Sequence, residues 1–594
     1  MSYRRKKLLA LFFAMALSMT AVAGCTGAKS STGNVVSSET ETNAEETSAQ
    51  SEAGTFSSAD MFTERDLAGT YEESGAVYVT LSDDGIAGET DGVVIDGQMV
   101  TITAEGTYIF SGTLSEGQIV VDADNAKVQI VFDNVDITCA SSAAVYVKSA
   151  EKVFVTLAEG SQNTLRNTDE YVAIDDNNID AVIFAKSDLT LNGTGSLTII
   201  SAEGHGIVSK DDLKIIGGTY DITAAGHALS GKDSVRIADG TFILTAEKDG
   251  IHAENADDEE KGYIYIADGD FTITSDGDGM DASNIVQIED GTLDITAGGG
   301  SANSLKTHES DVPGGPGGGM PQNGEKLDGE SMPQMGEKPD GENMPQDTTT
   351  DESGTSTKGI KAGGGMYLNG GTYQIDSADD SIHSNANITI ADGTYTLATG
   401  DDGVHADDAL IVNGGTITVT ESYEGLEGLA VTINDGTIDI TASDDGINTA
   451  GEKMELNGGY IHILAGGDGV DSNGDLTING GEIYIDGPSD NGNSAIDYGD
   501  RSSAYVNGGM LVAIGSSGMA EGMSDSSKQE VLMVKLGEQM EAGDVELTDN
   551  EGNVIVSYTA LKSYDCVIIS TAEVESGATY TLTTSGTTTE VTAE

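Results

Sequence analysis

Along most of the chain one short pattern recurs about every 22 residues. Each copy contains an apolar-x-apolar triplet, an Asn-Gly-Gly-Thr or Asp-Gly-Thr turn, an aromatic-x-apolar-Thr segment and a second turn such as Asp-Gly-Ile-His, as in Val235–Ala253, Ile388–Ala406 and Val431–Thr449. A period of this length without helical periodicity is typical of one coil of a parallel β-helix, whereas a propeller blade needs about 40 residues. The repeat therefore predicts an all-β protein, a right-handed parallel β-helix with coils of about 22 residues.

The strand after the first turn indicates which side chains lie inside the coil. Its first and third residues after the threonine position are large and apolar in successive repeats, for example Tyr220 with Ile222 and Phe242 with Leu244. Alternate residues of a strand point to the same face. We therefore expect these rings to stack in the core and not to form a sugar-binding stripe.

The N-terminus carries an export signal. A basic segment precedes an apolar run at residues 8–23, and the sequence Val-Ala-Gly directly before Cys25 resembles a bacterial lipobox. Residues 1–24 are therefore predicted to be a lipoprotein signal peptide, with Cys25 as the lipidation site; an ordinary signal peptide that contains a cysteine is the alternative. The run is shorter than the roughly 20 residues of a membrane-spanning helix. We expect an extracellular protein at the cell surface that reaches the membrane only through its lipid anchor.

Composition divides the rest of the chain. Residues 25–60 are rich in Ser, Thr, Glu and Ala, which predicts a disordered tether. The β-helix is expected to span 61–514, with a low-complexity flexible loop inserted at 306–357, where Met-Pro-Gln recurs. Residues 515–594 alternate like a small antiparallel β unit, which we expect to cap the last coil, since an open edge invites aggregation.

Two positions in the second turn carry ionisable side chains in most repeats. Eight residues after the threonine position stand His227, Asp249, Asp278, Gly300, Asp380, Asp402, Glu424, Asp445, Asp468 and Asp490. Eleven residues after it stand His252, Asp281, Asn303, His383, His405, Glu427, Asn448, Asp471 and Asn493. Equivalent residues of a β-helix stack about 4.8 Å apart, where two carboxylates repel by about 3 kcal/mol at an effective dielectric of about 20. With almost no Lys or Arg nearby in the sequence, these acids predict a bound cation.

Ca²⁺ fits these acids best, because it is a hard cation that takes about six to eight oxygen ligands. The expected ligands are Asp278, Asp281, Asp402, Asp407, Asp445, Asp468 and Asp471. The alternative is that Asp-Gly simply makes good turns with solvated carboxylates. The histidines indicate a transition metal only weakly. The net charge of −73 makes nucleic acid and an anionic membrane surface poor partners, because both repel such a chain.

Four tyrosines are predicted to face outward from the strands. Flat phenol rings on a rigid sheet can stack against sugar rings. The candidate carbohydrate-binding residues are therefore Tyr265, Tyr367, Tyr484 and Tyr505.

Three stretches resemble a known family. Ala143–Gly160, Gly204–Ile215 and Lys261–Ile266 are similar to bacterial carbohydrate-binding β-helix proteins related in fold to pectate lyases. The resemblance runs from about residue 91 to the C-terminal unit, interrupted by the Met-Pro-Gln loop. It implies binding of cellulose and of acidic, pectin-like polysaccharide at the cell surface, with bound Ca²⁺.

The sequence assigns no catalytic residues. Asn167-Thr-Asp, Asp175-Asp and Gly204-His-Gly match parts of the polygalacturonase motifs, but the first two lie about seven residues apart, whereas that site needs carboxylates on successive coils. A pectate-lyase-like reaction needs a base, for which Lys210 and Lys248 are candidates. The sequence favours a Ca²⁺-loaded surface lipoprotein that binds cellulose or a polygalacturonate-like glycan. A pectate-lyase-like or polygalacturonase-like enzyme and a non-binding structural adhesin or spacer are the alternatives.

Overall fold

The computed structural model describes residues 55–88, 92–306, 356–499 and 501–593. The predicted signal peptide, Cys25, most of the predicted tether and nearly all of the predicted 306–357 loop lie outside the described residues. Within the described ranges, no helix has the length and apolar character needed to cross a membrane.

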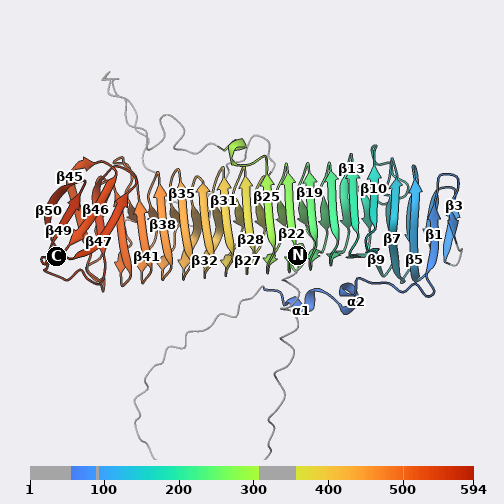
Figure 1. Ribbon diagram of the computed structural model, residues 1–594, viewed down its shortest axis with the longest axis horizontal. Helices are drawn as coiled ribbons and strands as arrows, with labels where there is room; N and C mark the ends of the chain where they lie inside the picture. Colours follow the sequence, from blue (N-terminus) through green and yellow to red (C-terminus); the bar gives the residue numbers. More distant parts are fainter. Residues whose placement is uncertain (1–54, 89–91, 307–355, 500, 594) are drawn as a thin grey trace, which may run out of the picture. The chain divides into compact units, whose positions relative to one another are not determined.

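Each coil of the repeat contributes three short strands, and each strand pairs in parallel with its equivalent one coil further on. The strands of one coil and their partners in the next are β18 (Ser234–Ile237) with β21 (Tyr263–Ile266), β19 (Thr241–Ala246) with β22 (Asp270–Ser275), and β20 (Ile251–Ala253) with β23 (Met280–Ala282). Figure 1 shows the strands stacked one beside the next along the long axis of this unit. Three parallel sheets result, here called sheet 1 (β18), sheet 2 (β19) and sheet 3 (β20). The predicted parallel β-helix is confirmed.

The same three sheets continue through the described coils. Sheet 1 also contains β9 (Lys152–Leu157), β12 (Asp188–Gly193), β15 (Asp212–Ile215), β24 (Val286–Ile288), β27 (Met366–Leu368), β30 (Ile388–Ile390), β37 (Met454–Leu456), β40 (Leu476–Ile478) and β43 (Ala504–Val506). Sheet 2 also contains β10 (Gln162–Asn167), β13 (Ser196–Ser201), β16 (Thr219–Ala224), β25 (Thr292–Ala297), β28 (Thr372–Ser377), β31 (Thr394–Thr399), β33 (Thr416–Glu421), β35 (Thr437–Ala442), β38 (Tyr460–Ala465), β41 (Glu482–Asp486) and β44 (Met510–Gly515). Sheet 3 also contains β4 (Met99–Ile102), β6 (Gln118–Asp122), β8 (Val145–Ser149), β11 (Ala181–Ala185), β14 (His205–Ser209), β17 (Leu229–Gly231), β26 (Ile360–Ala362), β29 (Ile382–Ser384), β36 (Ile447–Thr449), β39 (Val470–Ser472) and β42 (Ile496–Tyr498). Two longer strands, β32 (Val404–Val412) and β34 (Leu426–Ile433), run through sheets 3 and 1.

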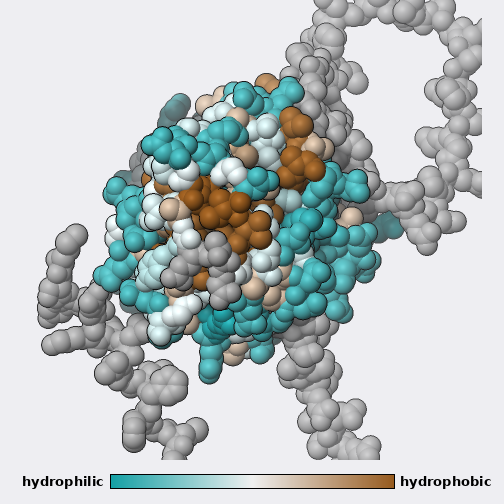
Figure 2. All heavy atoms as spheres, turned by 90° about the vertical axis from the view of Figure 1, so that its right-hand side faces the viewer, coloured by the Kyte–Doolittle hydropathy of each residue, from teal (hydrophilic) through white to brown (hydrophobic). Residues whose placement is uncertain are grey.

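The first coils are less regular. They contain β1 (Val77–Leu81), β2 (Ala87–Gly88), β3 (Val93–Asp96), β5 (Gly106–Leu114) and β7 (Lys127–Thr138). Two antiparallel pairs, β1–β2 and β3–β4, lie at this end. Figure 2 looks onto this end, where apolar atoms gather near the middle of the face and polar atoms surround them.

At the other end the last coil is continued by antiparallel strands. β44 pairs with β48 (Tyr564–Ser570), which also pairs with β45 (Leu532–Met540). A separate four-stranded sheet contains β46 (Gly543–Thr548), β47 (Val554–Ala560), β49 (Thr579–Thr584) and β50 (Thr587–Thr592). β44 is therefore paired on both sides, with β41 in parallel and with β48 antiparallel.

The core of the β-helix is a stack of equivalent apolar side chains. The ring of Phe242 lies between those of Tyr220 and Phe271, with ring centroids 5.2 and 4.6 Å apart. Only 1% of Phe242 is exposed. The turn before each strand of sheet 2 contains a glycine. Before β28, for example, Gly371 has φ +100°, and a Cβ there would lie 3.1 Å from the carbonyl oxygen of Gly291 in the preceding coil.

Replacing Phe242 with alanine tests this stack. We expect Phe242→Ala to lower the free energy of unfolding by about 3–5 kcal/mol, because the cavity lies between two rings that cannot collapse into it. The neighbouring Ile243 is 49% exposed, so Ile243→Ala should change the same quantity by less than about 0.5 kcal/mol. Denaturant unfolding of both variants measures the difference, and equal losses would contradict the assigned faces.

The N-terminal segment lies along sheet 1. It contains the short helices α1 (Ser58–Met61) and α2 (Glu64–Leu67). Phe56 exchanges two hydrogen bonds with the side chain of Gln287, at 2.6 and 3.0 Å. Asp66 is fully buried and accepts hydrogen bonds from Lys152 at 2.5 Å and Thr190 at 3.0 Å. Residues 55–60, which the sequence placed in the tether, are thus packed against the β-helix.

The ion pair between Asp66 and Lys152 should hold the N-terminal segment against the β-helix. Burial by itself raises the pKa of Asp66, but hydrogen bonds from Lys152 and Thr63 outweigh it and lower the pKa to about 2. Because this pKa is below the usual value of about 3.9, the stabilisation is complete above about pH 4 and is lost as the pH falls toward 2. At neutral pH we expect Asp66→Ala to release residues 55–68, measured as faster amide hydrogen exchange, because Lys152 is left buried and unpaired. Asp60→Ala, an exposed change in the same segment, should leave exchange unaltered; unchanged protection in Asp66→Ala would refute the role of the pair.

Candidate functional site

Two columns of polar side chains run along the edge of sheet 3. The first column consists of His205, the first residue of β14, and of the residues two positions before each later strand of this sheet: His227, Asp249, Asp278, Lys358, Asp380, Asp402, Glu424, Asp445, Asp468 and Ser494. The second column consists of the second residue of each strand of this sheet from β17 onward: Ser230, His252, Asp281, Lys361, His383, His405, Glu427, Asn448, Asp471 and Asp497. The predicted stacking of ionisable residues is present in both columns.

Two coils differ from the expected register. Lys358 and Ser494 occupy the first column where the sequence placed Gly300 and Asp490, and Lys361 and Asp497 occupy the second column where it placed Asn303 and Asn493. The turns of these two coils are longer, so a fixed count from the preceding strand points to the wrong residue. The strand that follows the turn, and not the one before it, sets the register.

Backbone N–H groups hold one oxygen of each aspartate in the first column. The Oδ1 of Asp249 accepts from the N–H of Asp278 at 2.9 Å, and the Oδ1 of Asp445 accepts from the N–H of Asp468 at 2.6 Å. Asp380 and Asp402 are joined in the same way at 3.1 Å. The second oxygen of these carboxylates can therefore contact side chains of the second column, as the Oδ2 of Asp380 contacts His383.

Lysines neutralise the middle of the columns, contrary to the expectation that almost none lies nearby. The ammonium group of Lys358 lies 2.6 Å from Asp380 and 2.9 Å from Asp379, and that of Lys306 contacts Asp379 and Asp401. Burial by itself raises the pKa of Asp380, but Lys358 and the other cations around it hold that pKa well below its usual range. Lys306 and Lys358 lie on either side of residues 307–355, so no repeat in the sequence indicates that they lie beside acids of later coils.

The acids toward the C-terminal end have no such partner. Asp445, Asp468 and Asp471 place one carboxylate oxygen each within 4.8 Å of one another. Burial and the neighbouring carboxylates raise their pKa values to about 8, about 7 and about 6, respectively. Among the described residues, none of the three forms an ion pair with Lys, Arg or His. The buried Oδ1 of Asn448, which lies beside Asp471 in the second column, also has no hydrogen-bond partner among the described residues.

The other expected Ca²⁺ ligands already have cationic neighbours. Lys361 lies 3.5 Å from Asp278 and 3.3 Å from Asp281. His405 lies 3.0 Å from Asp402 and 3.4 Å from Asp407. The seven predicted ligands therefore do not form one kind of site: of these seven described residues, Asp445, Asp468 and Asp471 form a cluster of carboxylate oxygens with no Lys, Arg or His in an ion pair with them.

The candidate sugar-binding tyrosines do not form one surface. Tyr265 is fully buried, because the N-terminal segment covers it and Phe62 lies 6.2 Å from its ring, so its assignment as an exposed residue is wrong. Tyr484 lies on sheet 2 and stacks on Tyr558 of the C-terminal unit at 5.2 Å. Tyr367 and Tyr505 lie on sheet 1 and are half-buried. Sequence reasoning could not find the covering segment, since its contacts span more than 200 residues of chain.

By its fold the chain is a parallel β-helix protein in which ionisable side chains stack from coil to coil. Comparison with known proteins identifies its family. A family model described as carbohydrate-binding domain-containing protein matches residues 96–403 and 401–579. The chain belongs to this family.

Two further similarities cover parts of the chain. A carbohydrate-binding domain-containing protein of Acetivibrio thermocellus is 40% identical over 139 residues, which are 23% of this chain and 49% of the relative. The chain thus matches about half the length of that relative. A solved structure, described as a gadolinium derivative of the polysaccharide lyase-like protein from C. thermocellum, is 36% identical and covers 38% of this chain and 92% of its own, with a TM-score of 0.37.

Removing a column lysine tests the charge balance. We expect Lys358→Met to lower the free energy of unfolding by about 3–5 kcal/mol, because it removes the ammonium group that pairs with the buried carboxylate of Asp380 and with Asp379. Added Ca²⁺ should restore part of this loss, since Asp379, Asp380 and Asp401 could then share a metal ion. Lys453→Met is the control, because Lys453 is exposed and pairs only with Glu455. Equal stability of the two variants would contradict the assigned role.

Proposed function

We propose that the protein binds polysaccharide, either cellulose or an acidic, pectin-like glycan, with Ca²⁺ held by its acidic turns. The family match carries this proposal, because it spans residues 96–579 and so covers nearly all the coils that bear the two columns. The name of the relative in Acetivibrio thermocellus points to the same class of ligand.

The donor set at Asp445, Asp468 and Asp471 suits Ca²⁺. It consists of carboxylate oxygens, and the Oδ1 of Asn448, which has no hydrogen-bond partner among the described residues, lies beside Asp471 in the second column. Hard divalent cations prefer such ligands, and the raised pKa values show that these carboxylates lack a compensating charge. A bound Ca²⁺ supplies positive charge on a very acidic surface. That charge would let the protein hold an anionic glycan that it would otherwise repel.

The proposal includes a location at the cell surface. It rests on the basic and apolar segments before Cys25, which would be lipidated after cleavage of residues 1–24. Residues 25–60 would then separate the lipid from the β-helix.

Sedimentation with insoluble polysaccharide tests the function. The purified protein is mixed with cellulose and with polygalacturonate gel, each with Ca²⁺ or with EDTA, and the bound fraction is measured. We expect retention on polygalacturonate that EDTA abolishes, without unsaturated product or new reducing ends. Product formation would show an enzyme instead, and no retention on either polymer would favour the structural spacer.

Neutralising the acidic cluster tests the Ca²⁺ site separately. We expect Asp468→Asn/Asp471→Asn to weaken Ca²⁺ binding at this site at least about tenfold, measured by calorimetry, because two of its three oxygen donors lose their charge. Asp169→Asn/Asp525→Asn removes the same charge from two exposed positions and should leave Ca²⁺ affinity unchanged. Equal affinities of the two double variants would place Ca²⁺ elsewhere.

A further inference from the structure

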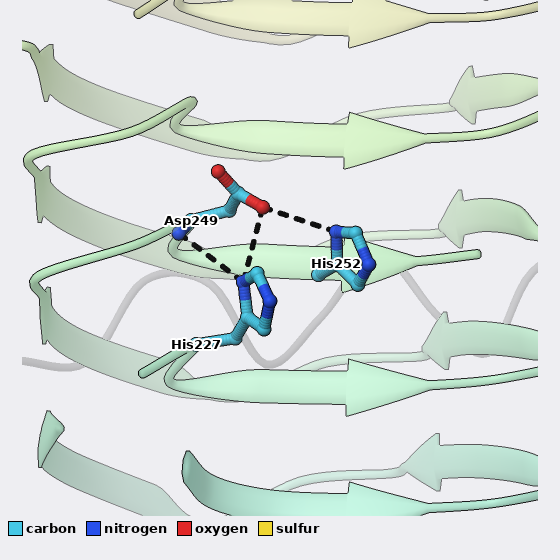
Figure 3. A group of neighbouring side chains, drawn as sticks. All are labelled: His227, Asp249 and His252. Atoms are coloured by element: carbon cyan, nitrogen blue, oxygen red, sulfur yellow. Dashed lines mark hydrogen bonds and ion pairs between the residues drawn. The ribbon is translucent and has the colours of Figure 1, made fainter. Parts of the chain in front are cut away.

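The N-terminal end of the two columns differs chemically from the acidic end, because it carries imidazoles. His205, His227 and His252 stack with ring centroids 4.8 and 4.1 Å apart. Asp249 lies beside the last two rings: its Oδ2 is 3.0 Å from the Nδ1 of His227 and 3.0 Å from the Nδ1 of His252 (Figure 3). The three donor atoms lie within 4.8 Å of one another.

These three donor atoms face one another, and among the described residues no Lys or Arg forms an ion pair with Asp249. The Nδ1 of His227 accepts from the backbone N–H of Asp249 at 3.2 Å, so it carries a lone pair, yet it also faces the carboxylate Oδ2 at 3.0 Å. The buried Nδ1 of His252 faces two carboxylates, the Oδ2 of Asp249 at 3.0 Å and the Oδ2 of Asp281 at 3.5 Å, without a hydrogen bond of good geometry to any described residue. Electron-rich atoms at this distance repel unless a proton or a metal ion lies between them. The hydrogen bond from the N–H of Asp249 to the Nδ1 of His227 is long at 3.2 Å and therefore weak. The lone pair of this nitrogen can therefore bind a metal ion instead.

Neighbouring groups orient Asp249 and His252 in the way that hydrogen-bond partners orient the ligands of a metal site. The Oδ1 of Asp249 is held by the N–H of Asp278, which leaves Oδ2 as the free ligand atom. The Nε2 of His252 lies 3.4 Å from Glu254, and a carboxylate on the far nitrogen fixes the ring of a metal-binding histidine. Among the described residues, the ion pairs of Asp249 are with the two imidazoles and with no lysine.

The other mixed clusters of the columns lack this combination. At Asp380, His383 and His405 the ammonium group of Lys358 already lies 2.6 Å from the carboxylate of Asp380. The cluster of Asp402, His405 and Glu427 has one imidazole and two carboxylates.

We propose that His227, Asp249 and His252 bind a borderline divalent transition-metal ion of the Zn²⁺ class. Two imidazole nitrogens and one carboxylate oxygen form a donor set that such ions prefer over Ca²⁺, which takes oxygen ligands. His227 and His252 also line an open hollow with a volume of about 400 Å³, which gives an ion access from solvent. With three protein ligands, a site of this kind keeps a position for water or for a ligand.

Calorimetric titration of Zn²⁺ into the untagged protein tests the proposal. Millimolar Ca²⁺ is present throughout, so that the oxygen sites are occupied by Ca²⁺ and the nitrogen site is observed alone. We expect one Zn²⁺ equivalent that Ca²⁺ does not displace, and Co²⁺ at the same site should give the visible absorption of a four-coordinate ion. Lowering the pH should weaken binding, because protons compete for the imidazoles. Absence of Zn²⁺ binding by the unaltered protein in excess Ca²⁺ would overturn the proposal.

Variants locate the ion. His252→Gln and Asp249→Asn should each weaken Zn²⁺ binding at least tenfold and remove the Co²⁺ absorption. His462→Gln is the matched control, because His462 lies on sheet 2 beside Asp439 and outside both columns, and it should bind Zn²⁺ as the unaltered protein does. Circular dichroism confirms that each variant is folded. Folded His252→Gln and Asp249→Asn variants that bind Zn²⁺ with unchanged affinity would also overturn the proposal.

Discussion

In a parallel β-helix each strand is hydrogen-bonded to its equivalent one coil away, so every side chain has counterparts of the same register on both sides. For apolar residues this constraint is favourable: Phe242 stacks between Tyr220 and Phe271, and the core continues from coil to coil. For ionised residues the same spacing brings like charges together at about 4.8 Å. The two columns along sheet 3 show how one chain meets this cost in different ways.

The columns change character along the β-helix. Imidazoles mix with carboxylates around Asp249, lysine ammonium groups fill the middle around Asp380, and carboxylates stand alone around Asp468. The consequences appear in the pKa values: that of Asp380 is held low by cations, whereas those of Asp445 and Asp468 are raised to about 8 and about 7. A repeat that is regular in backbone therefore presents chemically distinct positions, each suited to a different cation.

The repeat was sufficient to predict the β-helix, the inward-facing aromatic residues and the stacking of turn acids, because these depend only on periods within the chain. The residues that balance the charge were not predictable in the same way. Lys306 and Lys358 flank a long segment and meet acids of other coils, and Lys358 entered the column where counting had placed Gly300. Tyr265 faces outward from its coil as expected, but the N-terminal segment covers it. Contacts between residues far apart in sequence leave no periodic signal.

Anomalous diffraction from crystals grown with Ca²⁺ would test the central claim, that the uncompensated carboxylates and not the lysine-paired ones hold this ion. The account predicts an anomalous peak about 2.3–2.6 Å from oxygens of Asp445, Asp468 and Asp471, and none among Asp379, Asp380 and Asp401, where lysines supply the charge. A peak at the lysine-paired acids, or no peak at Asp445, Asp468 and Asp471 with the crystal in Ca²⁺, would contradict it.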